Sequence, residues 1–340
     1  MNVTIKDVAR IAGVSVASVS RALNGHDTVT GPTRARILAV ATRLRYTPNG
    51  AARSLITRRT QTVGAVLPDL HGEFFSELMR GMDAAARARG LHLLVSGSHG
   101  SASEAAGVLR TLRGRVDGVL VMSPHADAGV LADNLPASLP TVLMNTRHAG
   151  SRYPSLSIDN HGGAHAMVRH LAGCGYRRIA CIAGPADNFD AAERLRGYHD
   201  ARQALLPGQA PIVLRGDFSE ESGYRAGLCL GEPATWPDAI FAANDVMAIG
   251  CLFALGERGI RVPDDIALAG FDDIPIARFV SPPLSTVSVR IAELGQRALE
   301  RLAASIDASE PAAAQDDVLG CSLVIRRSCG ASGRERADTS

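Results

Sequence analysis

Residues 4–24 read TIKDVARIAGVSVASVSRALN, a stretch with apolar residues at helical spacing on both sides of Gly13. Thr4 is placed to cap a first helix, with Asp7 at the end that the helix dipole favours for an acid. Ser15 is placed to cap a second helix over 16–23, which Asn24-Gly25 ends. The first helix buries its apolar face, made of Ile5, Val8, Ala9, Ile11 and Ala12. The stretch predicts two short helices joined by a tight turn.

A third helix is expected from about Pro32 to Arg45, with Thr30 as its cap and proline in its first turn. Its inward residues are predicted to be Ile37, Leu38, Ala41 and Leu44. Two helices joined by a short glycine-containing turn and packed on a third form the helix-turn-helix unit that binds DNA.

The second helix of such a unit enters the major groove, so its first residues face base edges. Val16 and Ala17 can contact thymine methyl groups, and Arg21, one turn later, can donate two hydrogen bonds to guanine. Two alternatives remain open: Val16 belongs to the core, and Arg21 meets only phosphate.

The charge of the chain is unevenly distributed. Residues 1–60 hold ten Lys and Arg against two Asp, a net charge of +8, whereas the remainder carries −6. A basic head on an acidic body favours a polyanion as partner. A solvated basic tail is the alternative, and the helical pattern of the head argues against it.

The composition is that of a soluble globular chain of two or three domains: 340 residues, 46% apolar and 21% charged. No apolar run approaches the roughly 18 residues of a membrane span, and we expect no membrane partner. The first residues lack a basic stretch followed by an apolar one, so we expect no secretory signal and a cytoplasmic protein. The six cysteines show no CxxC spacing and are expected to be reduced core thiols.

From Thr62 onward, short runs rich in Val, Leu and Ile alternate with amphipathic helical stretches. The predicted strands are 62–67, 91–96, 116–121, 141–144, 178–183, 211–214, 238–242 and 266–271. Continuous apolar strands with intervening helices predict parallel sheets covered on both faces. Two such series predict an α/β body of two parallel-sheet lobes.

Four pieces of the head resemble the lactose/galactose-repressor (LacI/GalR) family in order and spacing. They are Ile5–Ala9, Ala12–Ser15, Val19–Asn24 and Tyr46–Asn49. The resemblance implies a DNA-binding domain over 1–48, and a hinge helix and linker over 49–60 in which Leu55 wedges between bases of the minor groove. The DNA-binding residues that it implies are Thr4, Ser15, Val16, Ala17, Ser20, Arg21, Asn24, Tyr46, Asn49, Ala52 and Leu55.

The body resembles the same family, through motifs such as Ile182–Pro185, Ala243–Asp245 and Ala269–Asp273. The implied fold is periplasmic-binding-protein-like, with a ligand between two lobes. The effector-binding domain is expected over 61–330. Its first lobe spans about 61–157 plus 286–315, and its second about 158–285 plus 316–330. Residues 331–340 are expected to be a disordered tail without the heptads of a tetramer-forming coiled coil.

The resemblance implies an effector site of Phe74, Asn145, Arg194, Phe218, Asn244 and Asp272. The two phenylalanines would flank the apolar face of a sugar ring, and the other four would bind hydroxyl groups. Alternatives remain for three of them. Asp272 could cap a turn, Arg194 could pair with a surface acid, and Phe74 could be core. Asp159-Asn160 is expected to cap the next helix rather than meet ligand.

These features predict a homodimeric transcription regulator, a repressor that binds a pseudo-palindromic DNA operator and a small sugar-like effector. A co-repressor-dependent regulator or an activator is an alternative. A sugar-binding transport protein fits poorly because of the basic head. We expect no enzyme activity, no cofactor and no metal: His161 and His165 share a helix face, but no HExxH, GxSxG or phosphate-binding loop is present.

Overall fold

The computed structural model describes residues 3–23, 28–46, 59–124, 134–135, 138–146, 153–308 and 315–330. The chain divides into two compact units, Met1–Thr60 and Gln61–Ser340. Most of the expected hinge and the tail 331–340 lie outside the described residues. So do four residues of the expected DNA-binding set: Asn24, Asn49, Ala52 and Leu55.

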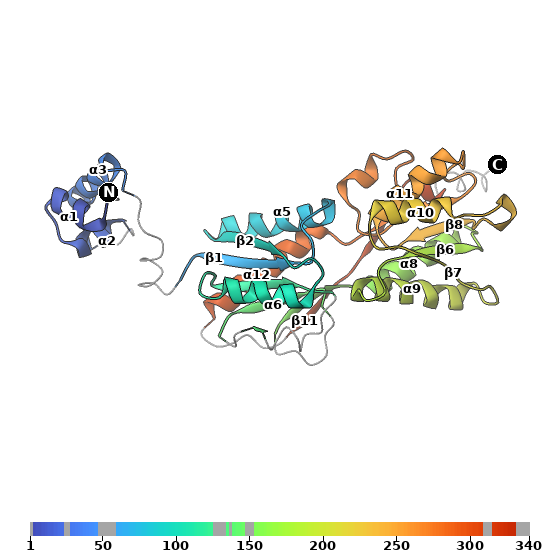
Figure 1. The fold of residues 1–340 in the computed structure, drawn as a ribbon, viewed down its shortest axis with the longest axis horizontal. Coiled ribbons are helices and arrows are strands. Elements are labelled where there is room, and N and C mark those ends of the chain that lie inside the picture. The colour runs from blue at the N-terminus through green and yellow to red at the C-terminus, as the bar shows by residue number, and fades with distance from the viewer. Residues whose placement is uncertain are drawn as a thin grey trace. The chain divides into compact units, whose positions relative to one another are not determined.

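The first unit is a small helical domain of α1 (Ile5–Ala12), α2 (Val16–Leu23) and α3 (Gly31–Arg43). Gly13 ends α1 with a φ of 63°, a left-handed conformation that glycine adopts at no steric cost. The three helices enclose a core of small and branched residues: Val8, Ala9, Ala12, Val19, Ala22, Ile37 and Ala41. This confirms the predicted all-α head (Figure 1).

Two predicted core positions of the head are wrong. Leu38 is 45% exposed and Ile11 is 39% exposed. Ile37 and Ala41, four residues apart, form the inner face of α3, and Leu38 lies about 100° further around the helix. The third helix also ends two residues earlier than expected, because Arg45 takes a φ of 52°.

The first lobe of the second unit is a six-stranded parallel sheet in the order β11-β5-β4-β3-β1-β2. The strands are β1 (Thr62–Leu67), β2 (His92–Gly97), β3 (Gly118–Met122), β4 (Thr141–Met144), β5 (Ser155–Ile158) and β11 (Asp316–Leu319). Its helices are α5 (Glu73–Ala88), α6 (Ala102–Leu112) and α12 (Ile291–Asp307).

Helices cover both faces of this sheet (Figure 1). In β1, Val63, Ala65 and Leu67 share a buried cluster with α5 and α12. Val66, between them, belongs to a separate cluster with α6. Alternate residues thus serve opposite layers, which explains why the strand is apolar throughout.

The second lobe has a four-stranded parallel sheet in the order β7-β6-β8-β9. Its strands are β6 (Ile179–Ala183), β7 (Ile212–Arg215), β8 (Ala239–Ala242) and β9 (Ala267–Ala269). Its helices pack in pairs, α8 (Asn160–Gly173) on α9 (Phe189–Leu205) and α10 (Glu220–Leu228) on α11 (Asp245–Glu257). Three short 3₁₀ turns complete it: η1 (Pro233–Thr235), η2 (Pro275–Arg278) and η3 (Arg327–Cys329).

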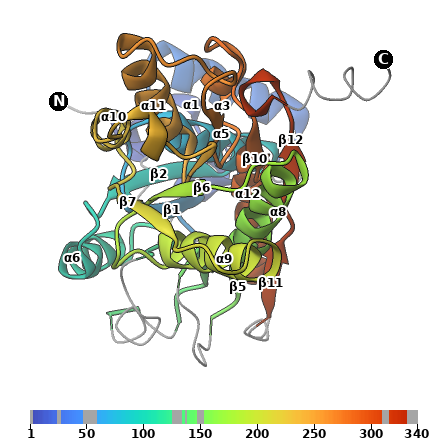
Figure 2. The ribbon, with the colours of Figure 1, turned by 90° about the vertical axis from the view of Figure 1, so that its right-hand side faces the viewer.

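The chain crosses between the lobes more than once. It enters the second lobe after β5 and returns through β10 (Thr286–Ser288) to α12. It crosses again after β11 into β12 (Ser322–Val324), which pairs antiparallel with β10. Figure 2 shows these late segments in red beside α8 and β5. The expected lobe boundary at 316 is four residues early, because Asp316 to Leu319 pair with β5 of the first lobe.

The cysteines are free thiols. Cys181, Cys251 and Cys329 are buried as expected, but Cys229 is exposed and is no core thiol. No helix in the described part of the chain is both long and apolar enough to span a membrane.

Candidate functional site

A cavity of about 270 Å³ lies between the two lobes of the second unit. The first lobe contributes residues that follow β1 and β3, among them Asp69, Phe74 and Pro124. The second lobe contributes α9 and the segments that follow β7, β8 and β9. The carboxyl ends of parallel strands meet here, which is where open α/β sheets bind their ligands.

Arg194 is the central polar group of the cavity wall. It lies on α9 and is only 4% exposed. Its Nε donates to Asn160 Oδ1 at 2.8 Å and its Nη1 to the Ala243 carbonyl at 2.6 Å. Its Nη2 forms an ion pair with Asp272 Oδ1 at 3.0 Å. A guanidinium has five N–H donors, so part of its donor capacity remains for a ligand.

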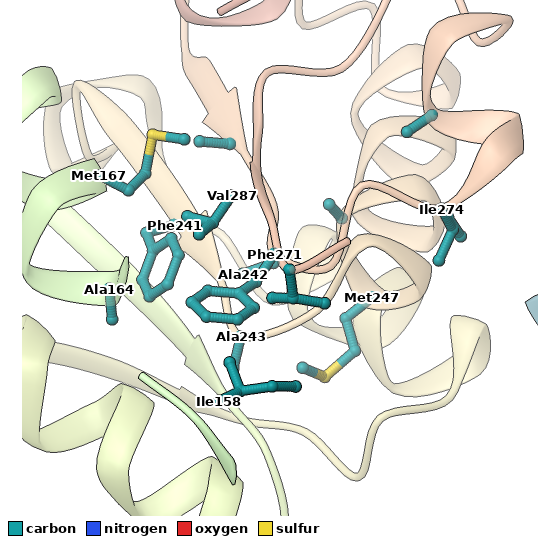
Figure 3. Packing of buried hydrophobic residues seen from close by; sticks show 14 of the residues in the cluster. Ile158, Ala164, Met167, Phe241, Ala242, Ala243, Met247, Phe271, Ile274 and Val287 are labelled. Carbon is teal, nitrogen blue, oxygen red and sulfur yellow. The ribbon is translucent and has the colours of Figure 1, made fainter. Parts of the chain in front are cut away.

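The aromatic ring of Phe271 packs against the guanidinium of Arg194. The guanidinium carbon of Arg194 lies 3.9 Å from the centroid of the Phe271 ring, a cation–π contact. The ring belongs to the buried apolar cluster that also holds Phe241, Ala243 and Met247 (Figure 3). A rigid core residue and three polar partners therefore fix the guanidinium plane.

Asp272 follows directly after this phenylalanine, with a φ of 111°. Burial raises the pKa of its carboxyl to about 6, although the charge of Arg194 acts in the opposite direction. The alternatives for both residues, a turn cap for Asp272 and a surface pair for Arg194, are wrong, because the two side chains are buried and paired with each other.

Asp190 is a cavity residue outside the predicted set. It is 6% exposed and accepts a hydrogen bond from Asn160 Nδ2 at 2.8 Å. Burial raises its pKa to about 6, with Arg194 lowering the pKa and Asp272 raising it. Asp190 precedes Arg194 by one helical turn, so the i,i+4 spacing was the signal that could have found it.

Asn160 is a second residue outside the predicted set. Asp159 caps α8 as expected, since its Oδ1 accepts from Gly162 N at 2.8 Å. Asn160 instead is buried at the start of the helix and joins Arg194 to Asp190 through its two amide atoms. It does not line the cavity but holds two residues that do.

Phe74, Phe218 and Asn244 line the cavity. Phe74 is half-buried rather than core. Asn244 caps α11, with its Oδ1 accepting from Met247 N at 2.9 Å and its Nδ2 donating to the Phe218 carbonyl at 3.1 Å. Its amide therefore fixes the Phe218 loop.

Asn145 does not line the cavity. Its Oδ1 accepts from Ile158 N at 3.2 Å, and it is 1% exposed. The backbone turns at this residue with a φ of 42°, which directs the side chain toward β5. Its side chain also lowers the pKa of Asp190. Asn145 therefore lies next to a residue of the wall, and its contact with the effector stays a prediction.

Most of the exposed lining is apolar, as predicted, but its charged groups are mainly acidic. Among the described residues, the lining holds six carboxyl groups against two basic residues, Arg194 and His71. The six acids are Asp69, Glu73, Asp190, Asp217, Glu220 and Asp272. Among the described residues, no group of three or more His, Cys, Asp and Glu is arranged to hold a metal ion.

The first unit presents the predicted DNA-facing residues of α2 on its surface. Val16 is 40% exposed, so it is not core, and Ala17 and Arg21 are exposed as well. Arg21 Nε donates to the Ala17 carbonyl at 3.3 Å. Ser20 is half-buried.

The remaining described residues of that set have local structural contacts. Ser15 caps α2, with its Oγ accepting from Ser18 N at 3.1 Å. Thr4 donates to Asp7 Oδ2 through both its N–H (3.0 Å) and its hydroxyl (2.8 Å). Tyr46 packs against the helical core.

Comparison with known proteins places both units in one family. Residues 4–49 match the model of bacterial regulatory proteins of the lacI family, and residues 168–329 match that of a periplasmic binding protein-like domain. Catabolite control protein A of Priestia megaterium is 33% identical over 305 residues, 89% of this chain and 92% of that protein.

Two solved structures are similar across nearly the whole chain. The lac repressor dimer bound to operator and the anti-inducer ONPF has a TM-score of 0.86 at 28% identity, covering 97% of this chain and 99% of that one. The complex of the transcriptional regulator CelR with cellobiose has a TM-score of 0.71 at 33% identity, covering 96% and 100%. The chain therefore belongs to the lacI family of bacterial regulatory proteins and is a DNA-binding regulator of transcription.

Proposed function

We propose that the chain acts as a homodimeric repressor on a pseudo-palindromic DNA operator. The exposed residues Val16, Ala17 and Arg21 of α2 support the assignment of this helix to the major groove. Two heads would read half-sites about one helical turn of DNA, or a multiple of it, apart. The lac repressor, which this chain resembles, was solved as a dimer on its operator.

The other predicted DNA-binding residues complete this proposal. Ser20 of α2, together with Thr4, Ser15, Asn24 and Tyr46 outside it, would contact or position the DNA backbone. Asn49, Ala52 and Leu55 would form the hinge at the minor groove, where an inserted leucine kinks the duplex. These hinge residues lie outside the described part of the chain.

The cavity between the lobes is the proposed effector site. The single observation that carries this proposal is the buried network of Arg194, Asp272 and Asn160 in the wall of an open cavity. Such a set of fixed donors and acceptors beside Phe74 and Phe218 is typical of sugar-binding sites. CelR, a similar regulator, was solved with cellobiose.

Effector binding would then weaken operator binding, so that the effector acts as an inducer. The two sites are coupled through the relation of the lobes, and the coupling free energy is reciprocal. The chain would act without catalysis or a cofactor, in the cytoplasm where its DNA target lies.

The test is release of a labelled operator duplex, followed by fluorescence anisotropy, while a panel of monosaccharides and disaccharides is titrated. Arg194→Ala should leave operator affinity unchanged and abolish the response to the effector. Arg196→Ala, which changes the next exposed arginine on the same helix, should respond as the wild type does. An Arg194→Ala variant that still responds would show that the cavity is not the effector site. Tighter rather than weaker operator binding would identify a co-repressor.

A further inference from the structure

The described residues of the cavity wall carry more acidic than basic side chains. Of the six acids, Asp217 has a basic partner outside the lining, with its Oδ2 3.6 Å from Arg225 Nη2. Asp69 Oδ1 accepts from the backbone N–H groups of Leu70 and His71, and Glu73 Oε2 accepts from Ile276 N. These donors are neutral backbone groups, so each bond fixes a carboxylate without cancelling its charge. Any ligand in the cavity therefore approaches several fixed negative charges.

Among the described residues of the lining, Arg194 is the one arginine or lysine, and its charge is already shared. Asp272 forms an ion pair with the guanidinium of Arg194 at 3.0 Å. The charge of Arg194 also acts on the carboxyl of Asp190, one helical turn away. Two buried carboxylates therefore surround one buried cation, and a ligand phosphate or carboxylate would meet a guanidinium whose charge is balanced.

Asp190 is the member of this trio that remains oriented for a ligand. Asn160 Nδ2 holds one of its oxygens at 2.8 Å, and the residue lines the cavity while being 6% exposed. Asn160 cannot rotate freely, because its other amide atom accepts from Arg194. An ionised carboxylate only accepts hydrogen bonds, so its complement is a hydroxyl or amino group.

We propose that the effector is a polyhydroxylated molecule without any anionic group, and that Asp190 is the residue that excludes sugar phosphates and other anions. The inference rests on the proposed function, because it assumes that this cavity binds the effector. Hydroxyl or amino groups of the ligand donate to Asp190 and Asp272, and the remaining donors of Arg194 bind ligand oxygens. Specificity thus includes an unfavourable contact with the wrong ligand class.

The experiment compares matched pairs of ligands on the full chain by calorimetry: ribose with ribose 5-phosphate, and glucose with glucose 6-phosphate. The neutral member of a binding pair should bind at least about 100-fold more tightly than its phosphate, since like charges in a buried site are strongly unfavourable. Asp190→Asn should reduce that ratio about tenfold. Asp200→Asn removes the same charge from an exposed position on α9 and should leave the ratio unchanged.

A phosphate that binds as tightly as its parent sugar would overturn the proposal, as would an unchanged ratio in Asp190→Asn. If no sugar of the panel binds, the test measures binding of inorganic phosphate to the wild type and to the variants. Saturable phosphate binding to the wild type that Arg194→Gln abolishes would overturn the inference. Arg194-dependent phosphate binding that appears only in Asp190→Asn would support it. Failure of the proposed function looks different, because then no ligand of any charge changes operator affinity.

Discussion

Arg21 is the residue of the head on which a base preference depends. It is exposed on α2, and among the described residues its Nε donates to the Ala17 carbonyl one turn earlier. The small neighbours Val16 and Ala17 leave room for a long side chain to reach a base edge. Sequence preference in the major groove should therefore come mainly from this arginine.

Arg21→Ala should remove the guanine preference at one position of each half-site, at a cost of about 1–3 kcal/mol. Affinities for operator duplexes with each base at that position measure the effect. Arg10→Ala is the control, because Arg10 is exposed on α1 and pairs with Asp7. An unchanged base preference in Arg21→Ala would mean that Arg21 contacts only phosphate.

The buried carboxylate of Asp190 should lower the free energy of unfolding at neutral pH. Burial raises the pKa of Asp190 and of Asp272 to about 6, and that of Asp245 above its ordinary value. Between the ordinary value of 3.8 and about 6, the folded chain then binds protons that the unfolded chain releases. Stability therefore rises as pH falls from 7 toward 5.

Asp190→Asn should raise the free energy of unfolding at pH 7 by about 1–2 kcal/mol and flatten its rise toward pH 5. Denaturant unfolding at the two pH values measures both effects. Asp200→Asn should not stabilise, because the hydrogen bond from His161 lowers the pKa of Asp200. A loss of stability at pH 7 in Asp190→Asn would contradict the buried charge described here.

For single residues, the sequence predicted those that belong to short recognisable motifs. The resemblance of its motifs to the family implied Phe218, Asn244, Asp272 and Arg194 at the cavity, and the structure places them there. The orientation of Asn145 was not predictable from sequence, because it depends on a hydrogen bond to the neighbouring strand. The i,i+4 spacing to Arg194 places Asp190 on the same face of α9, but its burial depends on the packing of α9 against α8, which is not a local property.

Among the elements, α5 and α12 meet at an unusually close crossing. A Cβ on Gly81 would lie 1.9 Å from the carbonyl oxygen of Ala292, and one on Gly295 would lie 2.3 Å from that of Leu78. Because neither glycine has a side chain, the backbone of the other helix can approach closely. Both helices contribute residues to the buried core of the first lobe.

Gly81→Ala should destabilise the second unit by about 3 kcal/mol, because the added methyl group overlaps backbone that cannot rotate away. Gly107→Ala is the matched control within α6, where the nearest atom to a Cβ is Arg110 Nη2 at 3.8 Å. That change should stabilise by about 0.5–1 kcal/mol through helix propensity alone. Thermal unfolding of both variants measures the difference in stability. Equal changes in the two variants would contradict the close approach of α5 and α12.

The elements themselves were largely predictable, since period and caps are local properties. The helices of the head and eight strands of the body follow from apolar spacing, and Ser15 and Asp159 cap where expected. The short strands β5, β10, β11 and β12 were not predicted. The place of β11 was not predictable, because its sequence is mostly exposed and its pairing with β5 joins segments about 160 residues apart.

For the whole molecule, hydrogen bonds between described residues join the lobes beside the cavity. Glu73 Oε2 of the first lobe accepts from Ile276 N at 2.8 Å, and Phe189 N of the second lobe donates to the Pro124 carbonyl at 3.0 Å. A ligand that binds between these contacts changes the free energy of one lobe arrangement relative to another. This is the physical basis for coupling between effector and operator.

A dimeric, effector-controlled regulator can be tested by selection of random duplex DNA with the purified full chain, at one stated salt concentration and with and without the sugar panel. We expect enrichment of a pseudo-palindrome with two half-sites about one helical turn apart. We also expect one neutral sugar to change the enrichment. A single unpaired site, or no enriched sequence under any of these conditions, would contradict a dimeric, effector-controlled regulator.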